Sequence, residues 1–169
     1  MVVKGKIWVV SEFYFPIVTS TGYYITEIAE CLAKTNTVNV VTTDSVYNEN
    51  DEFSFVKTDF RNGVSISRIK SVKLSKNSFG SRVVKLLITS MQLFIKLLFS
   101  VNRNDSILIV TNPAFLILLM PLIKLFRRAK YKVLVHDIFP ENLVAIGKVK
   151  ETSLIYRLLK KVFDFAYSQ

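Results

Sequence analysis

The sequence predicts an α/β fold: a Rossmann-like, doubly wound and mainly parallel sheet flanked by helices. Short apolar runs that suit buried parallel strands alternate along the chain with longer segments of helical periodicity. Half of the 169 residues are hydrophobic, and with only five glycines and four prolines the chain is neither disordered nor collagen-like. This length suits one substantial core, so residues 1–169 are expected to form a single domain.

The expected elements alternate in the order β-α-β-β-α-β-α-β-α. Strands are expected at 7–11, 38–43, 63–70, 107–111 and 131–136. Helices are expected at 23–34, 81–100, directly after Pro113 and at 152–167, with Thr21 as the cap of the first helix and residues 44–60 as a polar loop. The uncharged stretch 106–123 is 18 residues long, but Asn112-Pro113 divides it into a strand, a turn and a buried helix rather than a membrane span.

The chain is both basic and apolar, which favours an anionic membrane surface as a partner over nucleic acid. It has 23 Lys and Arg against 13 Asp and Glu, a formal net charge of +10, and a mean hydropathy of +0.34. Between residues 60 and 104 there is no acid but there are nine basic residues: Arg61, Arg68, Lys70, Lys73, Lys76, Arg82, Lys85, Lys96 and Arg103. We expect Arg82, Lys85, Lys96 and Arg103 to face the membrane. The alternative is a solvated basic face over an ordinary core helix.

The cysteine and histidine counts exclude two kinds of site. Cys31 is the single cysteine, so no intrachain disulfide can form, and with one histidine no Cys/His zinc site can be assembled. We expect no metal, a reducing cytoplasmic setting, and a core position for Cys31 on the first helix. The apolar run near the N-terminus ends at Glu12 and lacks the pattern of a signal peptide.

Polar residues follow four of the expected strands, at Ser11-Glu12, Thr43-Asp44, Thr111-Asn112 and His136-Asp137. Because the carboxyl ends of parallel strands share one edge of a sheet, these residues should converge there, although loops after strands are often polar for no functional reason. Ser20-Thr21-Gly22 before a helix can cradle a phosphate. His136 can hydrogen-bond a sugar hydroxyl or phosphate, or act as an acid/base, although a lone histidine can also be structural.

The segments EFYFPIVTSTGYYITEIAECLAK, VNVVTT, GVSISRI, VTNPAFLIL and HDIFPENLVAIG, in this order, resemble family 4 glycosyltransferases, in particular the bacterial enzymes that build capsule, O-antigen and colanic acid. The resemblance implies a GT-B architecture of two facing Rossmann-like domains that retains the anomeric configuration and needs no metal or other cofactor. This chain would be the N-terminal, acceptor-side domain. The C-terminal nucleotide-sugar-binding domain would be absent from it, and the fragment alone would be inactive.

The resemblance also implies roles for individual residues. Thr21 and Gly22 match the loop that approaches the donor phosphates, and His136 matches a catalytic position near the transferred sugar. Asp137 and Glu141 match the polar motif facing the cleft, where Asn112 is also expected to contact the acceptor. The partners would be a nucleotide-sugar, a lipid-linked saccharide acceptor and the inner face of the bacterial plasma membrane.

Two other functions stay open from the residues. One is a non-catalytic, membrane-associated accessory subunit that docks a separate catalytic chain. The other is a nucleotide-using α/β enzyme such as a nucleotide-sugar-modifying dehydrogenase. The sequence has neither G-x-G-x-x-G nor G-x-x-x-x-G-K-[ST], which argues against a dinucleotide oxidoreductase and a P-loop NTPase.

Overall fold

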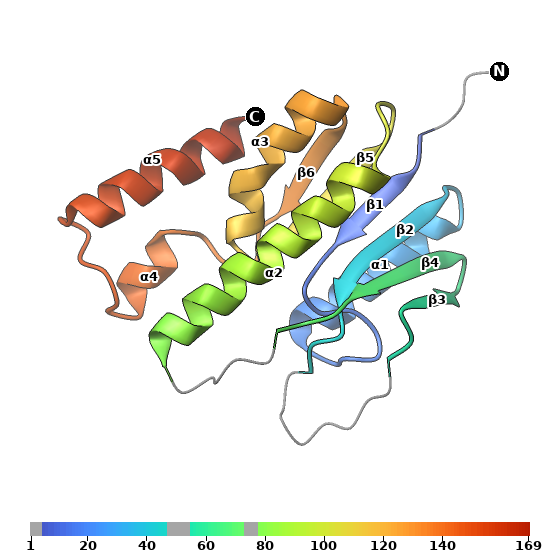
Figure 1. Ribbon diagram of the computed structural model, residues 1–169, viewed down its shortest axis with the longest axis horizontal. Helices are drawn as coiled ribbons and strands as arrows, with labels where there is room; N and C mark the ends of the chain where they lie inside the picture. The colour runs from blue at the N-terminus through green and yellow to red at the C-terminus, as the bar shows by residue number, and fades with distance from the viewer. Residues whose placement is uncertain (1–4, 47–54, 73–77) are drawn as a thin grey trace.

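The computed structural model describes residues 5–46, 55–72 and 78–169 and has the expected α/β architecture (Figure 1). Its strands are β1 (Ile7–Val10), β2 (Val38–Thr43), β3 (Thr58–Arg61), β4 (Val64–Ile69), β5 (Ser106–Val110) and β6 (Lys130–Leu134). Its helices are α1 (Ser20–Ala33), α2 (Phe79–Ser100), α3 (Phe115–Arg127), α4 (Glu141–Ala145) and α5 (Leu154–Ser168). The stretch 106–123 divides into a strand, a turn and a helix, as its Asn-Pro step indicates. Lys73 and Lys76 lie outside the described residues.

The six strands form one sheet in the order β3-β4-β2-β1-β5-β6. All neighbouring pairs are parallel except β3 with β4. The central strand β1 pairs with β2 on one side and β5 on the other, so that Val9 lies opposite both Val40 and Leu108. The chain builds one side of the sheet first, and α2 then carries it to the other side. The strand order therefore reverses at β1 and β5, as in a doubly wound fold.

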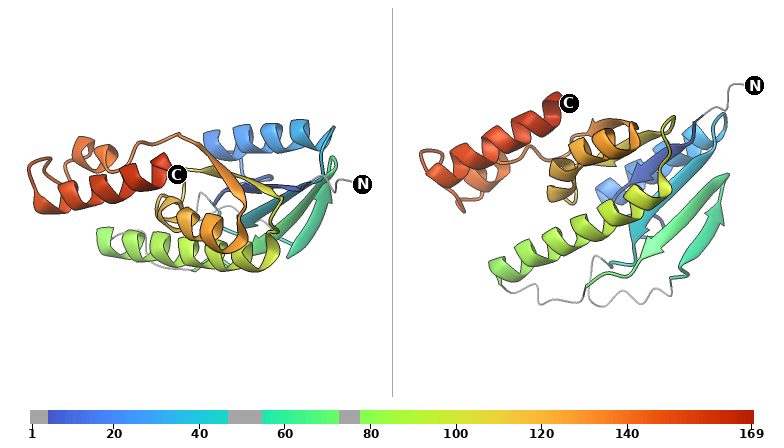
Figure 2. Two further views of the ribbon diagram at one scale, coloured as in Figure 1. Left: turned by 90° about the horizontal axis from the view of Figure 1, so that it is seen from above. Right: turned by 45° about the horizontal axis from the view of Figure 1, so that its top comes forward.

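Helices cover both faces of the sheet (Figure 2). Helix α1 lies on one face, α2 and α3 lie on the other, and α5 packs against α3. The alternation of side chains along β1 explains why its sequence is apolar throughout. Val9 packs into the cluster on the α1 face, whereas Trp8 and Val10 belong to the cluster on the α2 and α3 face.

Strand β3 and helix α4 were not expected. The expected polar loop 44–60 runs into β3, whose residues are mostly exposed and therefore lack the apolar alternation that marks a strand. Asn62 and Gly63 join β3 to β4 with φ angles of 46° and 82°. Two consecutive residues of positive φ suit a two-residue hairpin turn, and Asn-Gly is the common sequence for it. This dipeptide was the signal that could have revealed the hairpin.

Two expectations about α1 are wrong. The cap is Thr19 rather than Thr21, since the Thr19 hydroxyl accepts a hydrogen bond of 2.9 Å from the N–H of Gly22. Helix α1 therefore begins at Ser20, and Thr21 lies in its first turn. Cys31 is exposed rather than in the core, because it lies away from the buried row of this helix, which includes Ile25 and Ala29.

Helix α2 exposes much of its apolar surface. Its buried residues are Thr89, Ser90, Leu93, Phe94 and Leu97. Its outer side carries apolar residues that are 46% to 77% exposed: Val84, Leu87, Met91, Ile95 and Phe99. By length and composition α2 could cross a membrane, but the core helix of a soluble protein can pass the same test, and 28% of its most apolar window is buried. We call the five exposed residues the outer strip of α2.

Two leucines of α2 provide a matched test of this packing. Leu93 is completely buried and Leu87 is 47% exposed. Leu93→Ala should lower the free energy of unfolding by about 3 kcal/mol because it leaves a cavity. Leu87→Ala should change it by less than about 0.5 kcal/mol. Urea unfolding of the two variants measures the difference, and equal losses would contradict the outward position of Leu87.

Candidate functional site

The carboxyl ends of four parallel strands converge at one edge of the sheet, as expected. The hydroxyl oxygen of Thr111 accepts hydrogen bonds of 3.0 Å from the N–H groups of both His136 and Asp137. This joins the end of β5 to the residues after β6. At the centre, the Glu12 carbonyl accepts hydrogen bonds from the hydroxyls of Thr42 and Thr43. The sheet thus presents a continuous polar rim.

Helix α1 contributes a second component to this rim. The hydroxyl of Thr21 lies 3.3 Å from Nδ1 of His136, within hydrogen-bond distance, although 115 positions separate the two residues. Which group donates depends on the histidine tautomer. His136 is exposed and Thr21 is half-buried. The start of α1 and the turn after β6 therefore meet beside the point where the strand order reverses, which is where α/β sheets bind ligands.

Gly22 allows the loop after β1 to pack tightly on the start of α1. A Cβ atom at this position would lie 2.5 Å from the carbonyl oxygen of Ile17, which is a backbone atom and cannot move aside cheaply. The N–H of Gly22 is already bonded to Thr19. The first N–H groups of a helix have no acceptor within the helix, and Ser20 and Thr21 occupy these positions. These residues, rather than Gly22, present unbonded donors to an anion.

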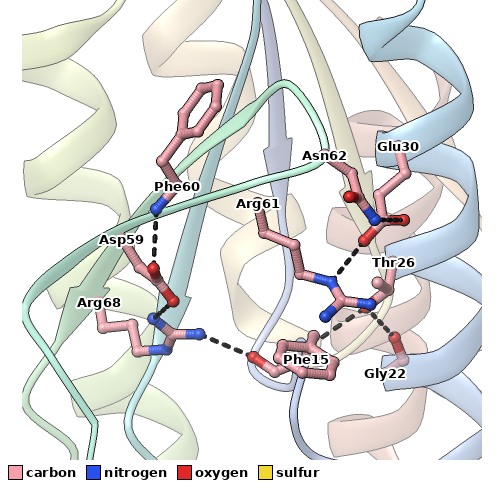
Figure 3. A network of polar contacts seen from close by, with 9 residues as sticks. All are labelled: Phe15, Gly22, Thr26, Glu30, Asp59, Phe60, Arg61, Asn62 and Arg68. Atoms are coloured by element: carbon pink, nitrogen blue, oxygen red, sulfur yellow. Dashed lines mark hydrogen bonds and ion pairs between the residues drawn. The ribbon is translucent and has the colours of Figure 1, made fainter.

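Polar contacts from the β3–β4 hairpin hold the loop after β1 in place (Figure 3). The Arg68 side chain is almost fully buried, and its Nη2 donates a hydrogen bond of 2.7 Å to the carbonyl oxygen of Phe15. The guanidinium of Arg61 lies 3.6 Å from the centre of the Phe15 ring. The N–H of Phe15 donates to the hydroxyl of Thr26 on α1. The loop is therefore fixed between the hairpin and α1.

Glu30 of α1 binds the same β3–β4 hairpin. Its two carboxylate oxygens accept hydrogen bonds of 2.7 Å from Arg61 and from Asn62. Burial alone would raise the pKa of Glu30, but these hydrogen bonds outweigh burial and hold the pKa below its usual value. The ionised carboxylate thus stabilises the hairpin against α1.

The other predicted site residues make local contacts. An oxygen of Asp137 accepts a hydrogen bond of 3.2 Å from Asn142. Glu141 pairs with Lys160 of α5 at 2.6 Å, and this hydrogen bond lowers the pKa of Glu141. The carbonyl of Asn112 accepts from the N–H of Glu12 at 3.3 Å. These contacts place Asn112 and Asp137 on the rim, while Glu141 joins α4 to α5. Their roles in binding remain predictions.

Comparisons with known proteins connect this geometry to a class of enzymes. No protein-family model matches the chain. Over 99 residues the chain is 39% identical to a protein of Pseudomonas aeruginosa named probable glycosyltransferase WbjE, a match that covers 59% of this chain and 25% of that protein. Over these residues the chain is similar in sequence to this probable glycosyltransferase.

A solved structure shares this fold. A solved structure described as trehalose-6-phosphate from E. coli bound with UDP-2-fluoro glucose, a GT-B glycosyltransferase, superposes with a TM-score of 0.56 at 17% identity. That match covers 94% of this chain and 38% of the other chain. The chain thus spans well under half the length of the proteins it matches. The similarity to this structure is one of fold, and it agrees with the expected GT-B architecture.

Lys85, one of the four basic residues expected to face a membrane, does not face outward. Its ammonium group lies 3.5 Å from the carboxylate of Glu12, which is 5% exposed and sits at the end of β1. Lys96 is half-buried as well, and both residues lie roughly a quarter turn around α2 from its outer strip. Arg82 and Arg103 are exposed. Lys85 therefore does not fit the expected membrane-facing set, and Lys96 lies on the flank of α2 rather than in its outer strip.

Sequence reasoning did not identify this Lys85–Glu12 pair. Glu12 was expected on the rim, but its ion-pair partner is 73 residues away along the chain, and no local pattern links the two. Within the described ranges 5–46, 55–72 and 78–169, no group of three or more His, Cys, Asp or Glu side chains could hold a metal ion.

The ion pair at Glu30 predicts a pH-dependent stability. Because folding lowers the pKa of Glu30, its contribution is fully present above the ordinary value of 4.5 and is lost as pH falls below it. Glu30→Gln should lower the free energy of unfolding by about 2 kcal/mol at pH 7. The difference from the wild type should shrink below pH 4.5.

The control for this measurement is Glu27→Gln, an exposed position on the same helix. Its free energy of unfolding should differ little from that of the wild type at either pH. Chemical denaturation at pH 7 and at about pH 3.5 measures all three proteins. A Glu30→Gln deficit that is equal at both pH values would contradict the charged pairing.

Proposed function

We propose that this chain is the acceptor-side, N-terminal domain of a retaining glycosyltransferase. The enzyme transfers a sugar from a nucleotide-sugar to a lipid-linked saccharide in the synthesis of bacterial surface polysaccharide. The observation that supports this most is the meeting of Thr21 and His136, 3.3 Å apart at the reversal of strand order. The name of the 39% identical relative and the UDP-2-fluoro glucose bound to the structural neighbour also support it.

The charges and hydrogen-bonding groups of the rim suggest which part of the reaction this domain serves and which part a second domain serves. In the reaction the bond between the sugar's anomeric carbon and the donor phosphate breaks, and a bond to an acceptor hydroxyl oxygen forms. The nucleoside diphosphate leaves and takes up the proton of that hydroxyl. The start of α1 favours the developing negative charge of that leaving group. His136 hydrogen-bonds the transferred sugar or the phosphate, and Asn112 and Asp137 contact the acceptor. A second domain outside this chain supplies most of the donor's binding site, and no metal or cofactor takes part.

The proposed location is the inner face of the plasma membrane, where a lipid-linked acceptor would be presented. The outer strip of α2 supplies apolar surface for contact with the bilayer. The exposed Arg82 and Arg103 lie near the two ends of this helix, at positions from which they can reach anionic headgroups. The domain then lies on the membrane through α2 while its rim stays open to the cytoplasm.

A transfer assay tests the proposed activity. The longer protein that the proposal implies is incubated with nucleotide-sugars and a lipid-linked saccharide, and product is detected by mass spectrometry. His136→Ala should lower kcat/KM at least about 100-fold, because it removes a hydrogen-bonding imidazole from the reacting sugar. The exposed Lys150 is the control, and Lys150→Ala should leave the rate unchanged.

The 169-residue chain alone should transfer no sugar and should show no heat of binding with nucleotide-sugars in calorimetry. Tight binding of a nucleotide-sugar to this chain would contradict the proposal that a second domain supplies most of the donor's binding site. A His136→Ala variant with full activity would contradict the role of that histidine.

Vesicle sedimentation tests the membrane contact. The chain should sediment with vesicles that contain anionic lipid at low salt, and less so at high salt. Phe99→Ser, in the outer strip, should weaken this binding about 30-fold because burial of a large apolar side chain is worth about 2 kcal/mol. Tyr24→Ser, an exposed position on α1 across the sheet, should have no effect. No sedimentation at low salt would rule out the membrane contact.

A further inference from the structure

A pocket of about 610 Å³ lies at the carboxyl ends of β2 and β4, on the side that α2 covers. Its described lining consists of Asp44, Phe55, Val56, Lys57, Ser67, Arg68, Ile69, Lys70 and Lys96. Strands β2 and β4 each contribute their last residues or the residue that follows. Lys96 comes from α2, and residues 55–57 lead into β3. The pocket is separate from the contact between Thr21 and His136 and carries none of the residues assigned to sugar transfer.

The pocket has an excess of positive charge. Asp44 is the single acid among its described lining residues, and one of its oxygens already accepts a hydrogen bond of 2.6 Å from the N–H of Ser71. The guanidinium of Arg68 is partly compensated by Asp59 at 3.5 Å. By contrast, Lys57, Lys70 and Lys96 form no ion pair with any residue that the structure describes. Three lysines around one concave site are an arrangement that binds a multiply charged anion.

Apolar surface borders this cationic pocket. Val56 lines it and is 60% exposed. Phe99 lies three residues after Lys96, so the two are neighbours on the surface of α2, and Phe99 is 77% exposed. Phe99 also belongs to the outer strip of α2. An occupant that matches both surfaces has an anionic head and a long hydrocarbon chain.

We infer that this pocket binds the diphosphate head group of the lipid-linked acceptor, with the lipid chain leaving past Val56 and Phe99 toward the outer strip of α2. A diphosphate matches three unpaired lysines better than the single phosphate of a common phospholipid does. The inference rests on the proposed function, since it names where the acceptor's anionic end is held. The saccharide attached to the diphosphate would then extend from the pocket toward the polar rim.

Binding measurements on the 169-residue chain test the inference without any sugar transfer. The probes are inorganic pyrophosphate and farnesyl diphosphate, and calorimetry gives the dissociation constants. Farnesyl diphosphate should bind at least about tenfold more tightly, because it adds apolar contact to the same head group. The double variant Lys70→Gln, Lys96→Gln should weaken both ligands by about tenfold or more. Phe99→Ser should weaken farnesyl diphosphate alone.

The control is Lys161→Gln, which removes an exposed lysine of α5, remote from the pocket, and should leave both constants unchanged. Circular dichroism checks that every variant is folded, which is expected because the substituted residues are exposed or half-buried. Unchanged binding in the double variant would overturn the inference. So would equal affinity for the two probes, or equally tight binding of a short-chain, water-soluble phosphatidylglycerol, which would indicate a general phospholipid contact.

These outcomes are distinct from failure of the proposed function. If the longer protein transfers no sugar while this chain still binds farnesyl diphosphate through its lysines, the proposed function fails and the pocket stands. If transfer occurs and the lysine variants bind both probes like the wild type, the pocket fails and the proposed function stands.

Discussion

The hydrogen bonds that fasten the carboxyl ends of the strands to one another are the constraint on which the site depends. Thr111 accepts from two successive N–H groups after β6, and the Glu12 carbonyl accepts from two hydroxyls at the end of β2. These bonds fix where each loop leaves the sheet. Only with the exit of β6 fixed in this way can His136 reach the first turn of α1, which belongs to a distant part of the chain.

In helix α2 the most apolar residues are not all buried, and some polar residues are. The sheet can cover one side of a helix, and here that side includes Thr89 and Ser90 as well as large apolar residues. Leu87, Met91 and Ile95 are left on the outside although they are as apolar as the core. An exposed row of large apolar side chains such as this is typical of a surface that contacts a partner or a membrane. The cationic pocket beside this surface suits the anionic head of a lipid whose chain would contact the outer strip.

Sequence reasoning predicted the fold well because buried parallel strands are often continuous apolar runs, and the run IWVV coincides with β1. It failed where local patterns carry no such signal. Strand β3 is exposed and short, and α4 spans only five residues. The rim was predictable because parallel strands share their direction, whereas the partner of Lys85 was not, since a long-range ion pair depends on how α2 packs. The orientation of α2 about its axis places Lys85 and Lys96 about a quarter turn away from its outer strip.

The role that the structure shows for Gly22 is steric. A glycine before a phosphate usually allows the backbone to approach the anion. Here the space beside Gly22 is filled by the carbonyl of Ile17, and its N–H is taken by Thr19. Its steric role is therefore to let the loop after β1 fold back on α1, a position that the Arg68 hydrogen bond to Phe15 also secures. A phosphate at this helix end would be bound by the N–H groups of Ser20 and Thr21, with the Thr21 hydroxyl and His136 beside them.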